Sequence, residues 1–167
     1  MKFIEKDLEQ IIFESGRDSL DERGLVINGI LKRQLKIGNY GIADLVEIQK
    51  PFYDGPEKRF FQYGRIIIYE LKKEQIGISA FLQAVKYAKG ISEYLQSKNK
   101  QHLFAIDIVL IGKSIDTSGS FCLIPSILNV KNYECFDTSI SFYTYKIDID
   151  GIWFEEHNNY DLKNKGF

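Results

Sequence analysis

The residues with the clearest chemical potential are a glutamate and a lysine that follow an apolar run. Glu70 and Lys72 come directly after Ile66-Ile67-Ile68-Tyr69, with one residue between them. Because side chains alternate along a strand, both would point to the face that Ile66 and Ile68 occupy. Charged side chains are seldom found at the end of a buried strand without a partner. The pattern is compatible with a mutual ion pair at a solvated strand end and with a catalytic pair.

A second carboxylate, Asp44, lies in the largely apolar stretch Gly41-Ile42-Ala43-Asp44-Leu45. If residues 42–49 and 65–73 form a hairpin, Asp44 would lie across from Glu70, on a strand about 4.8 Å away. Two carboxylates at that spacing can share a divalent cation. A turn aspartate at the start of a strand is the competing interpretation. Glu47 is the fallback ligand, although it would face the other side of the sheet.

The longest helical pattern spans residues 76–95 and carries two polar residues of interest. Gln83 and Tyr87 are four residues apart, so they would share one face of the helix. They flank a predicted apolar stripe that would pack on a sheet. That stripe consists of Ile78, Leu82, Val85 and Leu95, with Phe81 and Ile91 at its edges. The two polar residues would then look toward the end of the sheet, unless they are a surface glutamine and a half-buried tyrosine.

The first predicted helix, residues 3–13, carries two acids at the same spacing. Glu5 and Glu9 are four residues apart, and Leu8 and Ile12 would anchor the helix to the core. The two acids are equally compatible with a solvated helix face. On their own they therefore support no particular chemistry.

The elements that must position these residues follow from the hydropathy pattern. The helix at 3–13 is followed by strands at 31–37, 42–49 and 65–71, the long helix, and a buried strand at 103–111. Further strands are predicted at 121–127, 141–149 and 152–156, with Asp150-Gly151 as a hairpin turn. The strand-helix-strand passage requires a parallel pair, whereas hairpins require antiparallel pairs. The pattern predicts an α/β (α+β) fold whose central mixed sheet is flanked by helices, in the order α-β-β-β-α-β followed by further strands.

Composition and charge limit the number of domains and the classes of protein that the chain can belong to. The 167 residues fit one domain, and 44% hydrophobic residues exclude a disordered chain. Lys plus Arg total 22 and Asp plus Glu total 23, which excludes a broadly basic nucleic-acid coat protein. We assign residues 1–157 to a single domain and 158–167 to a polar tail. With no apolar run of membrane-spanning length and no apolar leader after Met1, we expect a cytoplasmic protein with no membrane partner.

In this order, the motifs resemble the PD-(D/E)XK nuclease superfamily, within it the branch with a NucS-type or RecB-type endonuclease catalytic domain and a Gln-x-x-x-Tyr helix. The resemblance covers residues 4–95. It rests on Glu5-Lys6-Asp7-Leu8-Glu9, Arg33-Gln34, Gly41-Ile42-Ala43-Asp44-Leu45, Ile67-Ile68-Tyr69-Glu70-Leu71-Lys72 and Gln83-Ala84-Val85-Lys86-Tyr87. It implies a restriction-endonuclease-like core and a DNA nuclease. A non-catalytic nucleic-acid or protein-binding module on this fold, or a nuclease acting on RNA, is the alternative.

The resemblance also implies a role for each motif residue. Asp44, Glu70 and the backbone carbonyl of Leu71 would ligate Mg²⁺, for which Mn²⁺ can substitute, because hard oxygen ligands suit these ions. Lys72 would orient or deprotonate the attacking water and steady the phosphate charge. The resulting enzyme would be a Mg²⁺-dependent phosphodiesterase, an endonuclease rather than an exonuclease.

Helix residues complete this implied site. Glu5 would complete the metal shell through water, with Glu9 as the competing candidate. Gln83 and Tyr87 would contact the substrate backbone or the residues around the metal. Duplex cleavage often needs two active sites, so a homodimer is compatible with this chemistry.

Two features depart from the family pattern or extend it. Ala43 stands where the family has proline, and Asp44 and Glu70 are 26 positions apart because of an insertion at 50–62. This insertion is a candidate substrate loop, since aromatic residues interleaved with cations suit stacking on unpaired bases. The predicted DNA contacts on the rim of the site are Arg33, Lys36, Lys73 and Lys86.

Overall fold

The computed structural model of this chain describes residues 3–54, 60–118, 121 and 139–157. Nearly all of the strand predicted at 121–127 and the whole predicted tail at 158–167 lie outside the described residues. The tip of the insertion, residues 55–59, also lies outside them.

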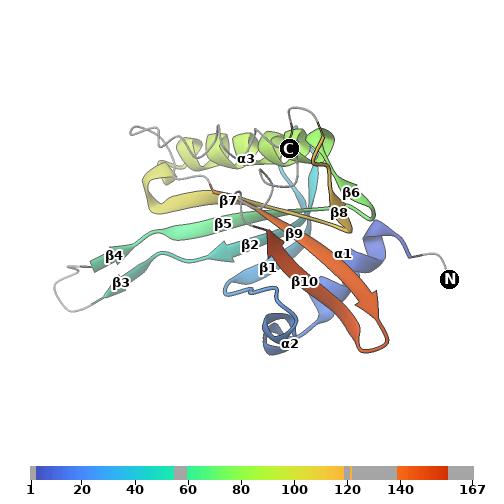
Figure 1. Ribbon diagram of the computed structural model, residues 1–167. Coiled ribbons are helices and arrows are strands. Elements are labelled where there is room, and N and C mark those ends of the chain that lie inside the picture. Colours follow the sequence, from blue (N-terminus) through green and yellow to red (C-terminus); the bar gives the residue numbers. More distant parts are fainter. Residues whose placement is uncertain (1–2, 55–59, 119–120, 122–138, 158–167) are drawn as a thin grey trace.

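A six-stranded mixed sheet forms the centre of the molecule (Figure 1). Its strands, in spatial order, are β1 (Ile30–Lys36), β2 (Ile42–Gln49), β5 (Gly64–Leu71), β7 (Phe104–Gly112), β9 (Ile140–Asp148) and β10 (Gly151–His157). The β1–β2, β2–β5 and β9–β10 pairs are antiparallel, whereas β5–β7 and β7–β9 are parallel. The mixed sheet flanked by helices that the sequence predicts is therefore confirmed.

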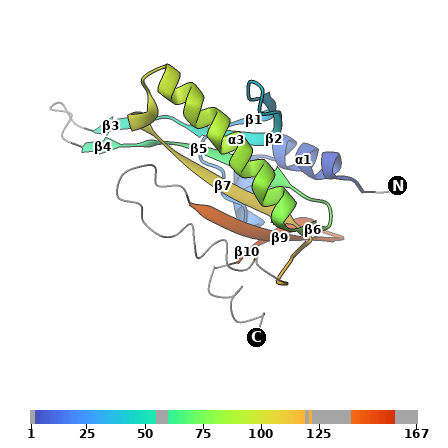
Figure 2. The ribbon, with the colours of Figure 1, turned by 90° about the horizontal axis from the view of Figure 1, so that it is seen from above.

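Helices cover both faces of this sheet. Helices α1 (Glu5–Glu14) and α2 (Arg17–Glu22) lie on one face, and α3 (Ile78–Ser97) runs across the other (Figures 1 and 2). The remaining elements are short: β3 (Phe52–Asp54), β4 (Phe60–Gln62), β6 (Gln75–Ile76), the 3-10 turn η1 (Gln101–Leu103) and β8 (Ser114–Ile115). Among the described helices, none has the length and apolar character needed to cross a membrane.

Strand β5 contributes to the core on both of its faces. Tyr69 and Leu71 pack with Leu8 and Ile12 of α1, whereas Ile66 and Ile68 belong to the core beneath α3. This two-sided burial explains the continuous apolar run, because a central strand covered on both faces has no solvent side. It also places Glu70 and Lys72 on the α3 face by alternation.

The orientation of α3 differs from the one its sequence predicts. Ile78, Leu82 and Val85 are 49%, 58% and 37% exposed, so most of the predicted apolar stripe is wrong. The helix instead packs through a face that includes small residues, among them Ala80, Ala84 and Gly90. Small side chains let the helix backbone approach the sheet closely. The same face also buries the larger side chains of Phe81, Tyr87, Ile91 and Leu95.

The insertion forms a two-stranded arm, β3–β4, that extends from β2 and β5 (Figure 1). It joins the last residue of β2, Gln49, to the first residue of β5, Gly64. Asp44 and Glu70 lie at the other ends of these same strands. The arm is thus at the opposite end of these strands from the two acids, and the interpretation of 50–62 as a substrate loop stays a prediction.

Gly90 tests the close packing of α3. A Cβ at this position would lie 2.6 Å from the Tyr40 ring and 2.7 Å from Ile37 Cγ2. Gly90→Ala should lower the free energy of unfolding by about 1–3 kcal/mol in urea denaturation, although alanine is the better helix former. Gly16→Ala is the control, because nothing lies within 4 Å of its Cβ. Stabilisation by Gly90→Ala would contradict the packing described here.

Candidate functional site

Glu70 and Lys72 form an ion pair at the end of β5. The pair leaves one oxygen of the Glu70 carboxylate without a hydrogen-bond partner. Lys72 Nζ donates to Glu70 Oε1 at 2.8 Å. Glu70 is 1% exposed, and its Oε2 is buried without a hydrogen-bond partner. The sequence left a mutual ion pair and a catalytic pair open, and the ion pair is present. It satisfies only half of the Glu70 carboxylate.

Asp44 reaches the same strand end from β2. The β2–β5 ladder ends at the pair Leu45–Tyr69, and beyond it the Leu71 N–H donates to Asp44 Oδ2 at 3.2 Å. A side-chain carboxylate thus accepts a backbone hydrogen at the point where the two strands stop pairing. Asp44 is held beside the segment that carries Glu70 and Lys72, as the hairpin argument expects.

Glu5 approaches from the first turn of α1. Its Oε1 accepts a hydrogen bond of 3.3 Å from the backbone N–H of Lys73, the residue directly after Lys72. Glu5 itself is exposed to solvent. Three carboxylates from α1, β2 and β5 therefore meet around one lysine.

Gln83 and Tyr87 pair with each other on α3. Gln83 Nε2 donates to the Tyr87 hydroxyl at 2.8 Å, and Tyr87 is 4% exposed. The Tyr87 ring packs over Gly41, where an added Cβ would lie 3.1 Å from the ring. Gly41 also has a φ of +118°, which favours glycine. These contacts fix Gly41, which directly precedes β2 and lies three residues before Asp44, against α3.

The electrostatics of this cluster are set by burial. Burial raises the pKa of Glu70 to about 7, the hydrogen bond and charge of Lys72 oppose the rise, and Asp44 and Glu5 add to it. Burial also raises the pKa of Asp44. The hydrogen bond from the Leu71 N–H and the charge of Lys72 lower this pKa, whereas the charges of Glu9 and Glu5 raise it further. Both acids are therefore harder to ionise than in water.

The same charges keep Lys72 protonated and extend to Tyr87. Burial lowers the pKa of Lys72, but its hydrogen bond to Glu70 and the charges of Glu70, Glu5 and Asp44 outweigh burial, so the net pKa is raised. Burial raises the Tyr87 pKa, Gln83 lowers it, and the charges of Glu70 and Asp44 raise it further. Tyr87 is therefore within electrostatic reach of the acids.

Only part of this arrangement is suited to a metal ion. Within the described ranges, no group of three or more His, Cys, Asp and Glu side chains is gathered closely enough to hold one. What fits a cation is the chemistry of the side chains at the strand end, which offer oxygen atoms only: the Asp44 carboxylate and the unpartnered Glu70 Oε2. Such oxygens suit Mg²⁺, which needs few protein ligands because it keeps several waters.

The two alternate acids lie outside this cluster and have partners for both oxygens. Glu47 is fully buried on the α1 face, where the Tyr69 hydroxyl donates to its Oε2 at 2.6 Å. Its Oε1 accepts hydrogen bonds from the backbone of Asn28 and Gly29 and from the Gln49 side chain. Glu9 is 3% exposed and is bound by Arg33 and Gln34.

The basic residues predicted on the rim differ in their surroundings. Lys36 and Lys86 are exposed at the end of β1 and on α3. Lys73 Nζ lies 3.4 Å from Glu74, and Arg33 is engaged by Glu9. Lys36 and Lys86 therefore present the more accessible charges.

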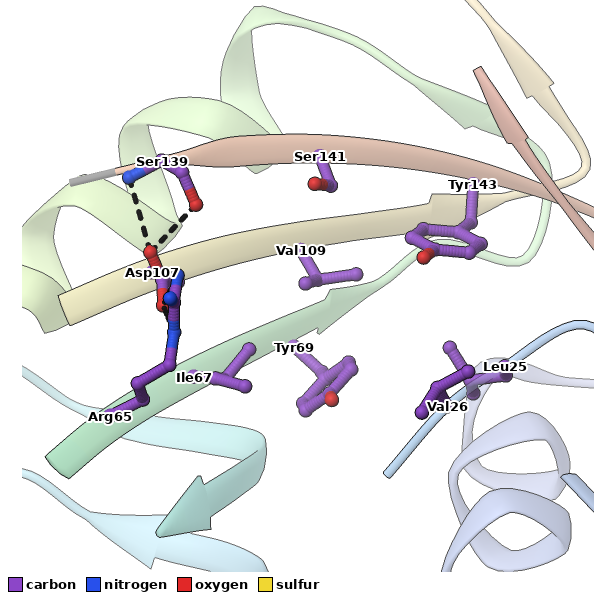
Figure 3. Close-up of a pocket in the computed structure, with 10 residues that line it drawn as sticks. All are labelled: Leu25, Val26, Arg65, Ile67, Tyr69, Asp107, Val109, Ser139, Ser141 and Tyr143. Atoms are coloured by element: carbon purple, nitrogen blue, oxygen red, sulfur yellow. Dashed lines mark hydrogen bonds and ion pairs between the residues drawn. The ribbon is translucent and has the colours of Figure 1, made fainter. Parts of the chain in front are cut away.

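A second cluster of polar residues lies on the other sheet face and was missed by sequence reasoning (Figure 3). Asp107 is 4% exposed and accepts hydrogen bonds from Arg65 Nε, at 2.7 Å, and from the Ser139 hydroxyl, at 2.6 Å. These residues and Tyr143 line a shallow pocket of about 140 Å³. The signal in the sequence was a single aspartate inside the apolar run 104–112, which needed a buried partner.

Comparison of the chain with models of protein families, with curated proteins and with solved structures finds no match. The support for a function therefore comes from the fold and from the side chains described above.

The raised pKa of Glu70 predicts a specific dependence of stability on pH. The carboxyl binds its proton more tightly in the folded chain, because the pKa rises from 4.5 to about 7. Its contribution to stability is full below about pH 4.5 and is lost as the pH rises toward about 7. Glu70→Gln cannot titrate, so its free energy of unfolding should fall less between pH 5 and pH 8, by up to a few kcal/mol.

The matched control is Glu14→Gln, which makes the same chemical change at an exposed position of α1. Urea denaturation at several pH values measures the slopes. Glu14→Gln should keep the slope of the wild type. Equal slopes for wild type and Glu70→Gln would show that Glu70 titrates normally.

Proposed function

We propose that this chain is a Mg²⁺-dependent nuclease that hydrolyses phosphodiester bonds of DNA, built on a restriction-endonuclease-like core. The order of the sequence motifs motivates the family. The observation that carries the proposal is the half-paired Glu70 carboxylate beside Asp44 and Lys72. A buried carboxylate oxygen without a donor is costly, and a site that receives a cation is one reason to keep it.

The contrast with the other buried acids strengthens this argument. Glu9, Glu47 and Asp107 are equally buried, and each has hydrogen-bond donors on both oxygens. Glu70 Oε2 has none. The chain can thus satisfy a buried carboxylate fully, and it leaves one incomplete at the strand end where the motif residues meet.

In this proposal Asp44, Glu70 and the Leu71 carbonyl would hold the metal. When bound, Mg²⁺ would polarise a phosphate oxygen and make a bound water more acidic. Lys72 would act as a cation rather than as a base, because its raised pKa keeps it protonated at neutral pH. It would steady the negative charge that develops on the phosphate. Lys36, Lys73 and Lys86 would contact the DNA backbone, and Gln83 with Tyr87 would support the site from α3.

Cleavage assays test the reaction. Single-stranded, duplex and branched DNA are incubated with Mg²⁺ or Mn²⁺ and the wild type, Asp44→Asn, Glu70→Gln, Lys72→Met or the control Glu14→Gln. Asp44→Asn, Glu70→Gln and Lys72→Met should each lower the cleavage rate more than about a hundredfold. Even residues that only hydrogen-bond to a metal ligand contribute about 10- to 100-fold to activity. Glu14→Gln should match the wild type. Absence of cleavage by the wild type, or equal rates for wild type and Glu70→Gln, would refute the proposal.

Cation binding should depend on pH, because protons compete for Glu70. With a pKa of about 7, the Glu70 carboxyl must lose its proton before it can bind a cation. Calorimetry should find that Mn²⁺ affinity rises about fivefold from pH 6 to pH 7, about twofold more to pH 8, and then levels off. Glu70→Gln should abolish this binding, whereas Glu14→Gln should preserve it. An affinity that does not change with pH would place the cation away from Glu70.

A further inference from the structure

Glu9 of α1 is a buried acid with two dedicated donors from consecutive residues of β1. It is 3% exposed, and burial of a carboxylate is tolerated only with partners. Arg33 Nε donates to Glu9 Oε1 and Gln34 Nε2 donates to Glu9 Oε2. Because both oxygens are bound, Glu9 has no oxygen left over for a metal, in contrast to Glu70.

Gln34 has an unusual backbone for a residue inside a strand. Its φ is +50°, and apart from glycines the only other described residue with a positive φ is Asn99. Asn99 directly follows the C-cap of α3, where asparagine adopts this conformation readily. Glutamine has no such preference, so the left-handed conformation of Gln34 is strained and must be held by its surroundings.

By register, the strained residue occupies the position of β1 that would pair with Asp44. The β1–β2 ladder pairs Arg33 with Leu45 and Leu35 with Ala43. Both pairs have the same register. In that register Gln34, between Arg33 and Leu35, would pair with Asp44, between Ala43 and Leu45. The ladder omits that pair. The irregular backbone is thus local to the position facing Asp44, and regular pairing continues on either side.

The shared partner explains the irregularity. Neighbouring side chains of a regular strand point to opposite faces of the sheet. Arg33 and Gln34 nevertheless bind the same carboxylate, one on each oxygen. The left-handed turn at Gln34 makes this possible, since it rotates the Gln34 side chain toward Glu9 instead of leaving it across from Asp44.

We propose that Glu9, Arg33 and Gln34 form a positioning clamp that keeps Gln34 out of the pairing position and leaves Asp44 turned toward β5. The Asp44 carboxylate then accepts the Leu71 N–H and remains beside Glu70 and Lys72. Glu9 acts through Gln34 and does not touch the cation. The functional consequence of the clamp rests on the proposed nuclease, whereas its structural consequence does not.

The electrostatics agree with this placement. The charge of Glu9 is among the causes that raise the pKa of Asp44, after burial and against the Leu71 N–H. The charge of Glu9 is therefore close enough to affect the ionisation of Asp44, although the two carboxylates share no hydrogen bond. The clamp gives the two acids of α1 different roles. Glu5 lies at the strand end beside Lys73, and Glu9 holds the Arg33 and Gln34 side chains of β1.

The first test concerns the backbone of Gln34. Because Gln34 adopts the left-handed conformation, Gln34→Gly should be more stable than Gln34→Ala, by about fivefold or more in the equilibrium constant for unfolding. Lys32 supplies the matched control, because it lies two residues earlier on the same strand in regular pairing. There the order should reverse, with Lys32→Ala more stable than Lys32→Gly. The same order at both positions would overturn the clamp.

The second test follows the Leu71 amide by hydrogen exchange. This amide donates to the Asp44 carboxylate, whereas the next amide, Lys72, donates to the backbone carbonyl of Ile111 at 2.7 Å. Glu9→Gln should accelerate exchange of Leu71 by about tenfold or more relative to Lys72. Gln34→Gly, which removes one clamp donor and keeps the backbone, should give a smaller acceleration. Unchanged Leu71 exchange in both variants would overturn the proposal.

Mn²⁺ titration of the same variants separates the clamp from the nuclease. Glu9→Gln should weaken Mn²⁺ binding about 10- to 100-fold at unchanged stoichiometry, Glu70→Gln should abolish it, and Glu14→Gln should leave it unchanged. Loss of the Mn²⁺ site in Glu9→Gln would make Glu9 a ligand and overturn the clamp. If Leu71 exchange responds but the wild type binds no Mn²⁺, the clamp stands and the nuclease proposal fails.

Discussion

The ion pair between Glu70 and Lys72 is the interaction around which this molecule is arranged. It lies at the end of β5, the strand buried on both faces, where a charge can be kept only with a partner. Lys72 supplies one hydrogen bond, and the second oxygen of Glu70 stays bare. Asp44 and Glu5 add further negative charge at the same strand end. The fold thus gathers an excess of acid around a single lysine.

Buried charges elsewhere in the described chain serve a different purpose. Glu47 joins β2 to the segment before β1 through the backbone of Asn28 and Gly29. Asp107 joins β7 to Ser139, directly before β9, and to Arg65 of β5. Each is a fully paired cross-link between segments that are distant in sequence. Their completeness is what makes Glu70 informative, because the other buried carboxylates of the described chain have donors on both oxygens, although Gln101 Oε1 is also buried without a partner.

Sequence reasoning reached the elements whose signals are local. The apolar run before Glu70 and the alternation of 31–37 predicted strands, because the period of the side chains is carried by the chain itself. The meeting of Asp44 with the Glu70 strand also followed, since strand spacing and hairpin pairing determine it. Partners such as Glu9 with Arg33, or Asp107 with Arg65, could not be predicted, because they depend on how separate elements pack.

The orientation of α3 is the error of the sequence-based prediction. The spacing of Ile78, Leu82 and Val85 predicted the wrong face, whereas Ala80, Ala84 and Gly90 lie on the face that approaches the sheet. The position of the 50–62 insertion depends on the strand pairing. The insertion separates Asp44 from Glu70 along the chain, but it joins the ends of β2 and β5 that are remote from these two acids. Separation along the sequence therefore does not tell where an insertion lies relative to a site.

The near-balance of 22 basic and 23 acidic residues has a local meaning in this fold. Lys72, and Arg33 with its Glu9 partner, use their charge on acids of the interior rather than on the surface. A bound divalent cation would relieve the acids at the strand end and free Lys72 to face an anionic phosphate. Charge neutrality of the whole chain is therefore compatible with an anionic substrate, provided that the positive charge appears at the site only when the cation binds.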